Sequence, residues 1–218
     1  VLSSWVLGAV FVIGISCWFL LKKRDKEFAV ASIKIGAVFG LVASLLTVWT
    51  GDGSGYAIAQ TQPMKLAAVE GYYEGQNGAG LVAVGLLNPE KKTYDDGQDP
   101  FLFRIEIPKM LSLLAERKVD AFVPGIKNII EGGYELKDGT KALSAAEKIE
   151  KGKKAIAALA TYRTAKKEGD EAAAKEAYTT LQENVSYFGY GYIKDVNQLV
   201  PNVPLNFYAF RVMVILGG

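Results

Sequence analysis

Two apolar stretches decide the fold: residues 1–21, VLSSWVLGAVFVIGISCWFLL, and residues 29–50, AVASIKIGAVFGLVASLLTVWT. The first contains no charged side chain, and the second contains only Lys34. A helix of about 21 residues rises roughly 30 Å, which is the thickness of the hydrocarbon core of a bilayer. We therefore predict a transmembrane helix over each range, and we expect the first helix to be truncated at its start.

The segment between these stretches, residues 22–28 with the sequence KKRDKEF, predicts which side of the membrane the next part of the chain occupies. It is too short for anything but a turn between antiparallel helices, and its consecutive cations favour the cytoplasmic side. The chain from residue 51 onwards is therefore expected on the outer face. A signal peptide is not expected, because its basic residues would precede the apolar stretch.

Residues 51–203 are ordinary in polarity and predict a large, mostly helical extracytoplasmic loop. We expect a short helix over residues 63–73, extended segments at LVAVGLL and FLFRIEI, and a helical hairpin over residues 142–188. Residues 204–218 are apolar again and predict the start of a further transmembrane helix, truncated at its end. The predicted fold class is all-α: a fragment of a transmembrane helix bundle with a large extracytoplasmic loop.

The composition excludes several classes of site. The chain contains no histidine and a single cysteine, Cys17. It therefore cannot form a disulfide within itself, a Ser-His or Cys-His catalytic pair, or a histidine-based zinc site. The net charge is only +2, and the basic excess lies in the KKRDK cluster, so no nucleic-acid partner is indicated.

The segment that follows the second apolar stretch, GDGSGYAIAQTQPMKLAAVE over residues 51–70, concentrates the candidate functional residues. Asp52, Tyr56, Lys65 and Glu70 are expected near the membrane surface, where an amphiphilic ligand can arrive from the lipid. Ionisable groups are costly to bury at such a depth and therefore tend to mark function. From spacing alone, an interfacial loop whose polar groups meet only water and lipid headgroups remains the simpler explanation.

The order of GDxSGY and QxxKLAAxE resembles subunit I of cytochrome bd-type quinol oxidases, at the start of the periplasmic loop that binds quinol. Three further segments resemble the same family in the same order: GAVFVIGISCWFLLKKRDKEFA, FRIEIPKMLSLLA and VPLNFYAFRVMV. The resemblance implies the haem-bearing subunit of a terminal respiratory oxidase, a multi-pass protein of the bacterial inner membrane. Such a subunit oxidises quinol at the outer face, passes electrons through haem b to an O₂-reducing site that yields water, and contributes to the proton motive force.

The resemblance also implies roles for individual residues. Lys65 and Glu70 fall on the lysine and glutamate that the family associates with quinol oxidation. A carboxylate can accept a proton from quinol, and a lysine can hydrogen-bond the quinol oxygen and favour its deprotonated form. Five residues along a helix turn about 500°, so the two side chains are expected roughly 140° apart, flanking a pocket rather than pairing. Asp52 and Tyr56 are expected to support substrate binding from their positions in the motif.

Met213 falls on the family's methionine ligand of the low-spin haem b. A thioether ligand raises the haem potential, which suits an electron acceptor for quinol. The partner ligand is a histidine, which we expect just before Val1 in the full-length protein. Arg211 is expected beside the same haem, although snorkelling of its side chain to the interface remains an alternative.

The remaining expectations concern further haems, a second subunit and an alternative class of protein. The resemblance implies additional haems b and d, whose ligands lie outside this chain, and a second oxidase subunit as a partner in the lipid membrane. The isolated fragment is expected to be inactive. The rival is a membrane-anchored sensor or protein-interaction module with an extracytoplasmic domain, which explains the apolar helices equally well but not the ordered motifs.

Overall fold

The computed structural model describes residues 1–217, with side chains through residue 215, and divides them into two compact units. One unit comprises Val1–Thr61 together with the chain from Tyr208, and the other comprises Gln62–Phe207.

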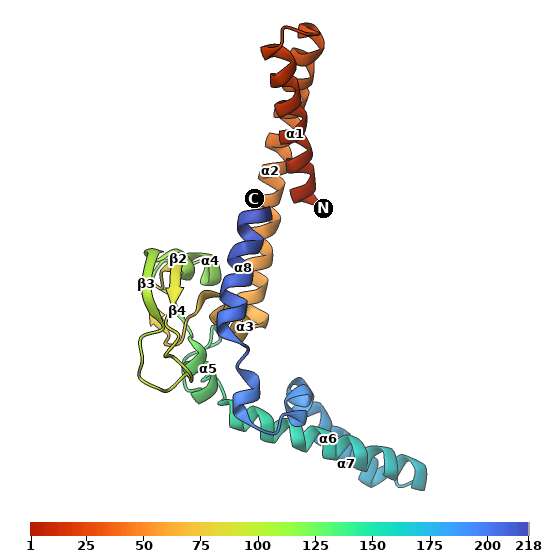
Figure 1. The fold of residues 1–218 in the computed structure, drawn as a ribbon. Coiled ribbons are helices and arrows are strands. Elements are labelled where there is room, and N and C mark those ends of the chain that lie inside the picture. Colours follow the sequence, from red (N-terminus) through yellow and green to blue (C-terminus); the bar gives the residue numbers. More distant parts are fainter. Residues whose placement is uncertain (218) are drawn as a thin grey trace. The chain divides into compact units, whose positions relative to one another are not determined.

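The helices are α1 (Leu2–Leu21), α2 (Lys26–Thr61), α3 (Pro63–Glu70), α4 (Met110–Glu116), α5 (Ile126–Glu131), α6 (Ala145–Glu168), α7 (Glu171–Asn184) and α8 (Val203–Gly217), with 3-10 helices η1 (Val185–Tyr192) and η2 (Val196–Leu199). The strands are β1 (Gln76–Asn77), β2 (Leu81–Leu87), β3 (Phe101–Ile107) and β4 (Phe122–Val123). The prediction of a mainly helical chain is confirmed (Figure 1).

Helices α1 and α2 run antiparallel and side by side (Figure 1), and small residues line the seam between them. A Cβ atom at Gly40 would lie 3.0 Å from Ala9 Cβ, and one at Gly36 would lie 3.1 Å from Ile13 Cγ1. Small residues let helix backbones approach closely, which is how helices associate in a bilayer. Most large apolar side chains of the pair are exposed, and both helices are long and apolar enough to cross a membrane.

The turn between α1 and α2 is shorter than the predicted range 22–28, because α2 already begins at Lys26. The Asp25 carbonyl accepts a hydrogen bond of 3.0 Å from the Ala29 N–H, which starts the helix. Glu27 lies in the first turn, where negative charge is favourable to the helix dipole.

Helix α2 also extends further than predicted, to Thr61 instead of residue 50. The glycines of GDGSGY favour a loop, since each costs a helix about 1 kcal/mol relative to alanine. A helix that is already nucleated, however, gains one hydrogen bond for each further residue that it orders. Its 36 residues span roughly 54 Å at about 1.5 Å per residue, which exceeds the roughly 30 Å of a hydrocarbon core. Asp52 and Tyr56 therefore lie on a helix.

Strands β2 and β3 form an antiparallel hairpin at the two segments predicted to be extended. The hairpin contributes Val82, Leu87 and Phe101 to a buried cluster that also contains Phe207. Phe207 is fully buried, and its ring centroid lies 5.5 Å from that of Phe101. Because Phe207 belongs to α8, this cluster attaches the beginning of α8 to the hairpin.

Helices α6 and α7 lie within the range in which the sequence predicts a helical hairpin. Ser144 caps α6 in a capping box, the chain reverses at Gly169, and Asp170 caps α7 by accepting a 3.0 Å hydrogen bond from the Ala173 N–H. Helix α6 also packs closely on η1. The backbones meet at Gly152 and Gly191, where no Cβ atom would fit.

Helix α3 ends three residues earlier than predicted, at Glu70, because Gly71 adopts a left-handed conformation with φ of 64°. A Cβ atom at Gly71 would lie 2.9 Å from Phe101 Cζ and 3.3 Å from Phe207 Cδ2. Glycine alone accommodates both the positive φ and this close approach. The end of α3 is thereby fixed against the buried cluster.

We predict that Gly71→Ala destabilises the Gln62–Phe207 unit more than Gly97→Ala. Both glycines have positive φ, 64° and 67°, but a Cβ at Gly97 would meet nothing within 4 Å. The backbone penalty of about 1–2 kcal/mol is common to both variants, whereas only Gly71→Ala adds overlap with the core, at about 1–3 kcal/mol. Thermal unfolding of the detergent-solubilised protein measures the difference, and equal midpoints for the two variants would contradict the packing account.

Candidate functional site

Helix α3 holds Lys65 and Glu70 in different surroundings. Pro63 occupies the first turn, where its missing N–H is not needed, and Gly71 ends the helix. Lys65 is exposed, whereas Glu70 is only 4% exposed. The two side chains therefore occupy different faces of a short helix, as their separation of five residues predicts. The buried carboxylate and the accessible ammonium can approach a ligand from different directions.

Asp52 and Tyr56 lie on α2 and are partly buried. Residues four apart on a helix share one face, so the carboxylate and the phenol project along the same side of α2. Asp52 and Tyr56 belong to the unit of the long apolar helices, and Lys65 and Glu70 belong to the Gln62–Phe207 unit. The structure thus shows two pairs of residues, each pair on one helix and in its own unit.

Arg211 and Met213 lie on α8 and also differ in exposure. Arg211 is partly buried, whereas Met213 is 60% exposed. Two residues along a helix turn about 200°, which explains the difference. The predicted range 204–218 for this helix ends at Gly218, which lies outside the described residues.

Met213 fits one axial position of a haem iron, since an exposed thioether is available as a donor. The chain contains no histidine, so a histidine ligand would have to come from outside it. Within residues 1–217 there is no group of three or more His, Cys, Asp or Glu side chains placed to hold a metal ion. The exposed thioether of Met213 is therefore compatible with a haem that is also held by a histidine from outside this chain.

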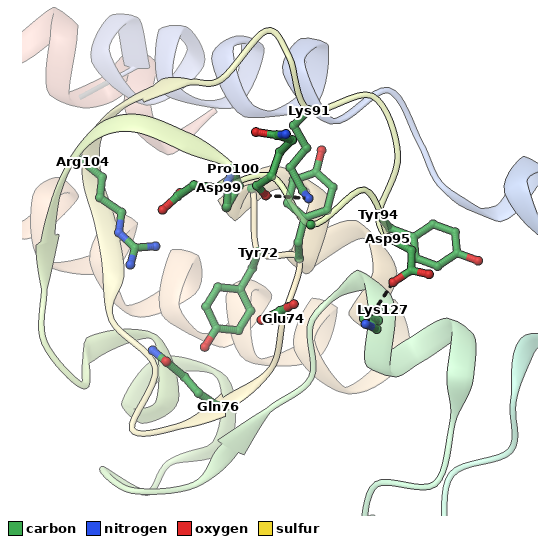
Figure 2. A pocket seen from close by; sticks show the side chains of 14 residues that line it. Tyr72, Glu74, Gln76, Lys91, Tyr94, Asp95, Asp99, Pro100, Arg104 and Lys127 are labelled. Atoms are coloured by element: carbon green, nitrogen blue, oxygen red, sulfur yellow. Dashed lines mark hydrogen bonds and ion pairs between the residues drawn. The ribbon is translucent and has the colours of Figure 1, made fainter.

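A polar cavity of about 410 Å³ lies beside the turn that follows α3 (Figure 2). Its wall is formed by this turn, by the loop between β2 and β3, and by α5. The charged residues of the lining are balanced in sign: Lys91, Arg104, Lys127, Glu74, Asp95 and Asp99. The described lining begins at Gly71 and contains neither Lys65 nor Glu70. The cavity is therefore a neighbour of the predicted residues and not the pocket between them.

Two tyrosines that follow Glu70 in the chain line this cavity, and burial raises the pKa of both. Burial raises the pKa of Tyr72 to about 12, although the neighbouring Gln76 partly offsets the rise. The Tyr72 hydroxyl is buried, and Gln76 is its polar neighbour. Burial also raises the pKa of Tyr73. Both phenols can therefore donate a hydrogen bond at neutral pH but cannot supply charge.

The sequence did not single out the residues of this cavity. Its loop, NPEKKTYDDGQDP, predicts only turns, because the contacts that define its role are non-local. Lys91 lies over the ring of Tyr73, and Asp95 pairs with Lys127, which is 32 positions later in the chain. No local pattern of charge or hydropathy encodes such pairs.

Comparisons with known proteins agree in their assignment. The family model of cytochrome bd terminal oxidase subunit I matches residues 1–218. Subunit 1 of the cytochrome bd-II ubiquinol oxidase of Escherichia coli (strain K12) is 32% identical over 236 residues, which cover 100% of the chain and 41% of that protein. A putative cytochrome bd menaquinol oxidase subunit I of Bacillus subtilis (strain 168) is 31% identical over 130 residues, covering 58% of the chain and 28% of that protein.

The solved structure of the bd oxidase from Geobacillus thermodenitrificans matches with a TM-score of 0.50 and 21% identity, over 99% of this chain and 44% of that one. At this identity the likeness shows the fold. The chain spans less than half the length of these relatives. Since the family model covers the whole of the sequence, the chain belongs to the cytochrome bd terminal oxidase subunit I family.

Proposed function

We propose that this chain forms the quinol-oxidising part of the haem-bearing subunit of a bacterial terminal respiratory oxidase. The observation that carries the proposal is α3, on which the KLAAVE motif presents an accessible lysine and a buried carboxylate from one helix with a fixed end. Relatives in the same family are named as ubiquinol and menaquinol oxidases, which supports a quinol as the substrate. Asp52 and Tyr56 are proposed to contribute to substrate binding from α2.

The chemistry assigns separate tasks to Lys65 and Glu70. Oxidation of one quinol to quinone releases two protons and two electrons. Glu70 accepts a proton from a quinol hydroxyl. Because Glu70 is buried, bulk water has little access to this carboxylate. Lys65 donates a hydrogen bond to the quinol oxygen and stabilises the negative charge that develops there. The second proton leaves towards the outer aqueous phase.

Met213 is proposed as one axial ligand of the low-spin haem b, and Arg211 as a neighbouring cation. When bound, the haem would supply a one-electron acceptor for quinol oxidation. Met213 would hold the iron through its thioether and Arg211 would balance negative charge nearby, which would also explain a lone arginine in an apolar helix. The histidine ligand of this haem, and the ligands of the further haems b and d, are proposed to belong to the rest of the full-length protein.

The setting is proposed to be the bacterial cytoplasmic membrane, with lipid and a second oxidase subunit as partners. The cations between α1 and α2 favour the cytoplasmic side, so residues 51–203 are proposed to face outwards. Proton release at this face, with uptake from the other side for the reduction of O₂ to water, contributes to the proton motive force. A membrane-anchored sensor would account for the apolar helices but not for the match of the oxidase family model to the whole chain.

We predict that Glu70→Gln lowers the quinol-dependent rate of O₂ consumption by about 10²-fold or more, since a positioned proton acceptor contributes typically 10²–10⁴-fold. Lys65→Met should lower the same rate by roughly 10- to 100-fold, because it removes one charge-assisted hydrogen bond worth about 1.5–3 kcal/mol. Oxygen uptake by the purified full-length oxidase over a range of quinol concentrations measures both effects. The haem spectra of both variants should match those of the unmodified enzyme.

The matched control for Lys65→Met is Lys153→Met, which removes an exposed lysine from α6. This control should retain full turnover. Unchanged turnover of the Glu70→Gln variant at every quinol concentration would contradict the proposed role of the carboxylate.

We predict that Met213→Leu, which removes the thioether but conserves volume, alters the absorbance band of the low-spin haem b and lowers its reduction potential. The reduced-minus-oxidised difference spectrum of the full-length oxidase measures the first effect, and a redox titration measures the second. Met110→Leu, a substitution in α4, is the matched control and should change neither. An unaltered spectrum in Met213→Leu would remove Met213 as a ligand.

A further inference from the structure

The turn that follows Glu70 is held by the backbone of α5. The carbonyl oxygen of Tyr72 accepts a hydrogen bond of 3.0 Å from the Ile126 N–H, and that of Tyr73 accepts one of 2.9 Å from the Lys127 N–H. These are the first two residues of α5, whose N–H groups have no partner within their own helix. The carbonyl groups of the turn and the free N–H groups of α5 therefore meet each other's hydrogen-bonding requirements.

Lys91 holds the same turn from the opposite side. Its ammonium lies 4.7 Å from the centroid of the Tyr73 ring, and its side chain is only 6% exposed. The ammonium also forms an ion pair of 2.7 Å with Asp96 Oδ1 and donates a hydrogen bond of 2.9 Å to the Gln98 carbonyl. A cation over an aromatic ring is bound more strongly when both are withdrawn from water.

Asp96 fixes the loop from which Lys91 projects. Its Oδ2 atom accepts hydrogen bonds of 2.7 Å and 2.9 Å from the Lys92 and Thr93 N–H groups, and its Oδ1 atom accepts one of 3.1 Å from the Gln98 N–H. The hydrogen bond from Lys91, followed by these backbone bonds, holds the pKa of Asp96 well below its usual range. The carboxylate is therefore charged at neutral pH, and the loop is fixed when it meets Tyr73.

A second ion pair closes a ring of contacts around the turn. Lys127 Nζ lies 3.0 Å from Asp95 Oδ1. Figure 2 marks this ion pair with a dashed line, and Asp95 is the neighbour of Asp96 in the loop. The contacts thus run from the Tyr73 ring through the loop to Lys127 and return to the Tyr73 carbonyl. We call these five residues, Tyr73, Lys91, Asp95, Asp96 and Lys127, the Tyr73 clamp.

We propose that Lys91 and Lys127 are positioning residues of the quinol-oxidising site, which hold the end of α3, and with it the Glu70 carboxylate, by clamping Tyr73. Glu70 is the last residue of α3 and lies three positions before Tyr73. Helix ends fray readily, while a displacement of about 1 Å at a reacting group can cost about 10²-fold in rate. The inference rests on the proposed role of Glu70 in proton transfer.

A clamp that served only the stability of the outer loop would act differently from one that positions Glu70. If the clamp serves only stability, a variant that breaks it should lose folded, haem-containing protein in proportion to its loss of activity. If the clamp positions Glu70, the same variant should assemble fully, but the end of its α3 should open more often and its kcat/KM for quinol should fall.

The test compares Lys91→Met with Lys92→Met in the full-length oxidase with its second subunit. Lys92 is the exposed neighbour of Lys91, and it contacts Asp96 through its backbone N–H. Hydrogen exchange of the Gly71 and Tyr72 amides, which bond the carbonyls of Ala68 and Ala67 at the end of α3, reports how often the helix end opens. Exchange should be roughly tenfold faster in Lys91→Met, as expected for loss of a desolvated cation–π contact, and unchanged in Lys92→Met.

Turnover supplies the second measurement. In Lys91→Met, kcat/KM for quinol should fall roughly tenfold while the haem difference spectrum stays unchanged, and Lys91→Arg should recover most of the loss because it restores the cation over the ring. Unchanged exchange at Gly71 and Tyr72 in Lys91→Met would overturn the clamp. Full turnover in Lys91→Met, beside a strong loss in Glu70→Gln, would overturn the positioning role and leave the proposed function standing. Full turnover in Glu70→Gln would instead overturn the proposed function, and the catalytic purpose of the clamp with it.

Discussion

The close approach at Gly71 is the constraint on which the Gln62–Phe207 unit depends. The absence of a side chain there lets the Phe101 and Phe207 rings close over the turn, and the positive φ ends α3 at Glu70. The same contact joins the beginning of α8 to the β2–β3 hairpin, because α8 contributes Phe207 to the buried cluster and the hairpin contributes Phe101. One residue without a Cβ atom therefore determines both where the proposed proton acceptor lies and what α8 rests against.

The packing around this turn explains how a buried carboxylate can be held in a chain rich in irregular structure. Helix α3 has only eight residues, too few to be stable by itself, since isolated helices shorter than about 12–15 residues are marginal in water. Its end is stabilised by contacts from elsewhere in the sequence, which include the N–H groups of α5 and the Lys91 ammonium over Tyr73. The proposed proton transfer at Glu70 would then depend on residues that take no direct part in the reaction.

The sequence predicted the features that follow from local pattern. Hydropathy identified α1 and the apolar part of α2, and β-compatible residues on either side of a turn-rich segment identified β2 and β3. The ordered motifs indicated the family that the comparisons confirm. The end of α2 was predicted wrongly, because the propensity of three glycines is a weaker influence than the propagation of a long helix. The cavity and the Tyr73 clamp were not predicted, since Lys91 meets Tyr73 and Asp95 meets Lys127 only after the chain has folded. The roles of Lys65, Glu70, Arg211 and Met213 came from resemblance and stay predictions.

The location of the bound quinol is the central claim, and photoaffinity labelling tests it most directly. A photoreactive quinol analogue, bound to the full-length oxidase and cross-linked by light, would be mapped on the chain by mass spectrometry. The account predicts that the label falls on the peptide that contains Pro63–Glu70 and that an excess of unmodified quinol suppresses it. Labelling that quinol suppresses only at peptides remote from α3, with none on this helix, would contradict the account.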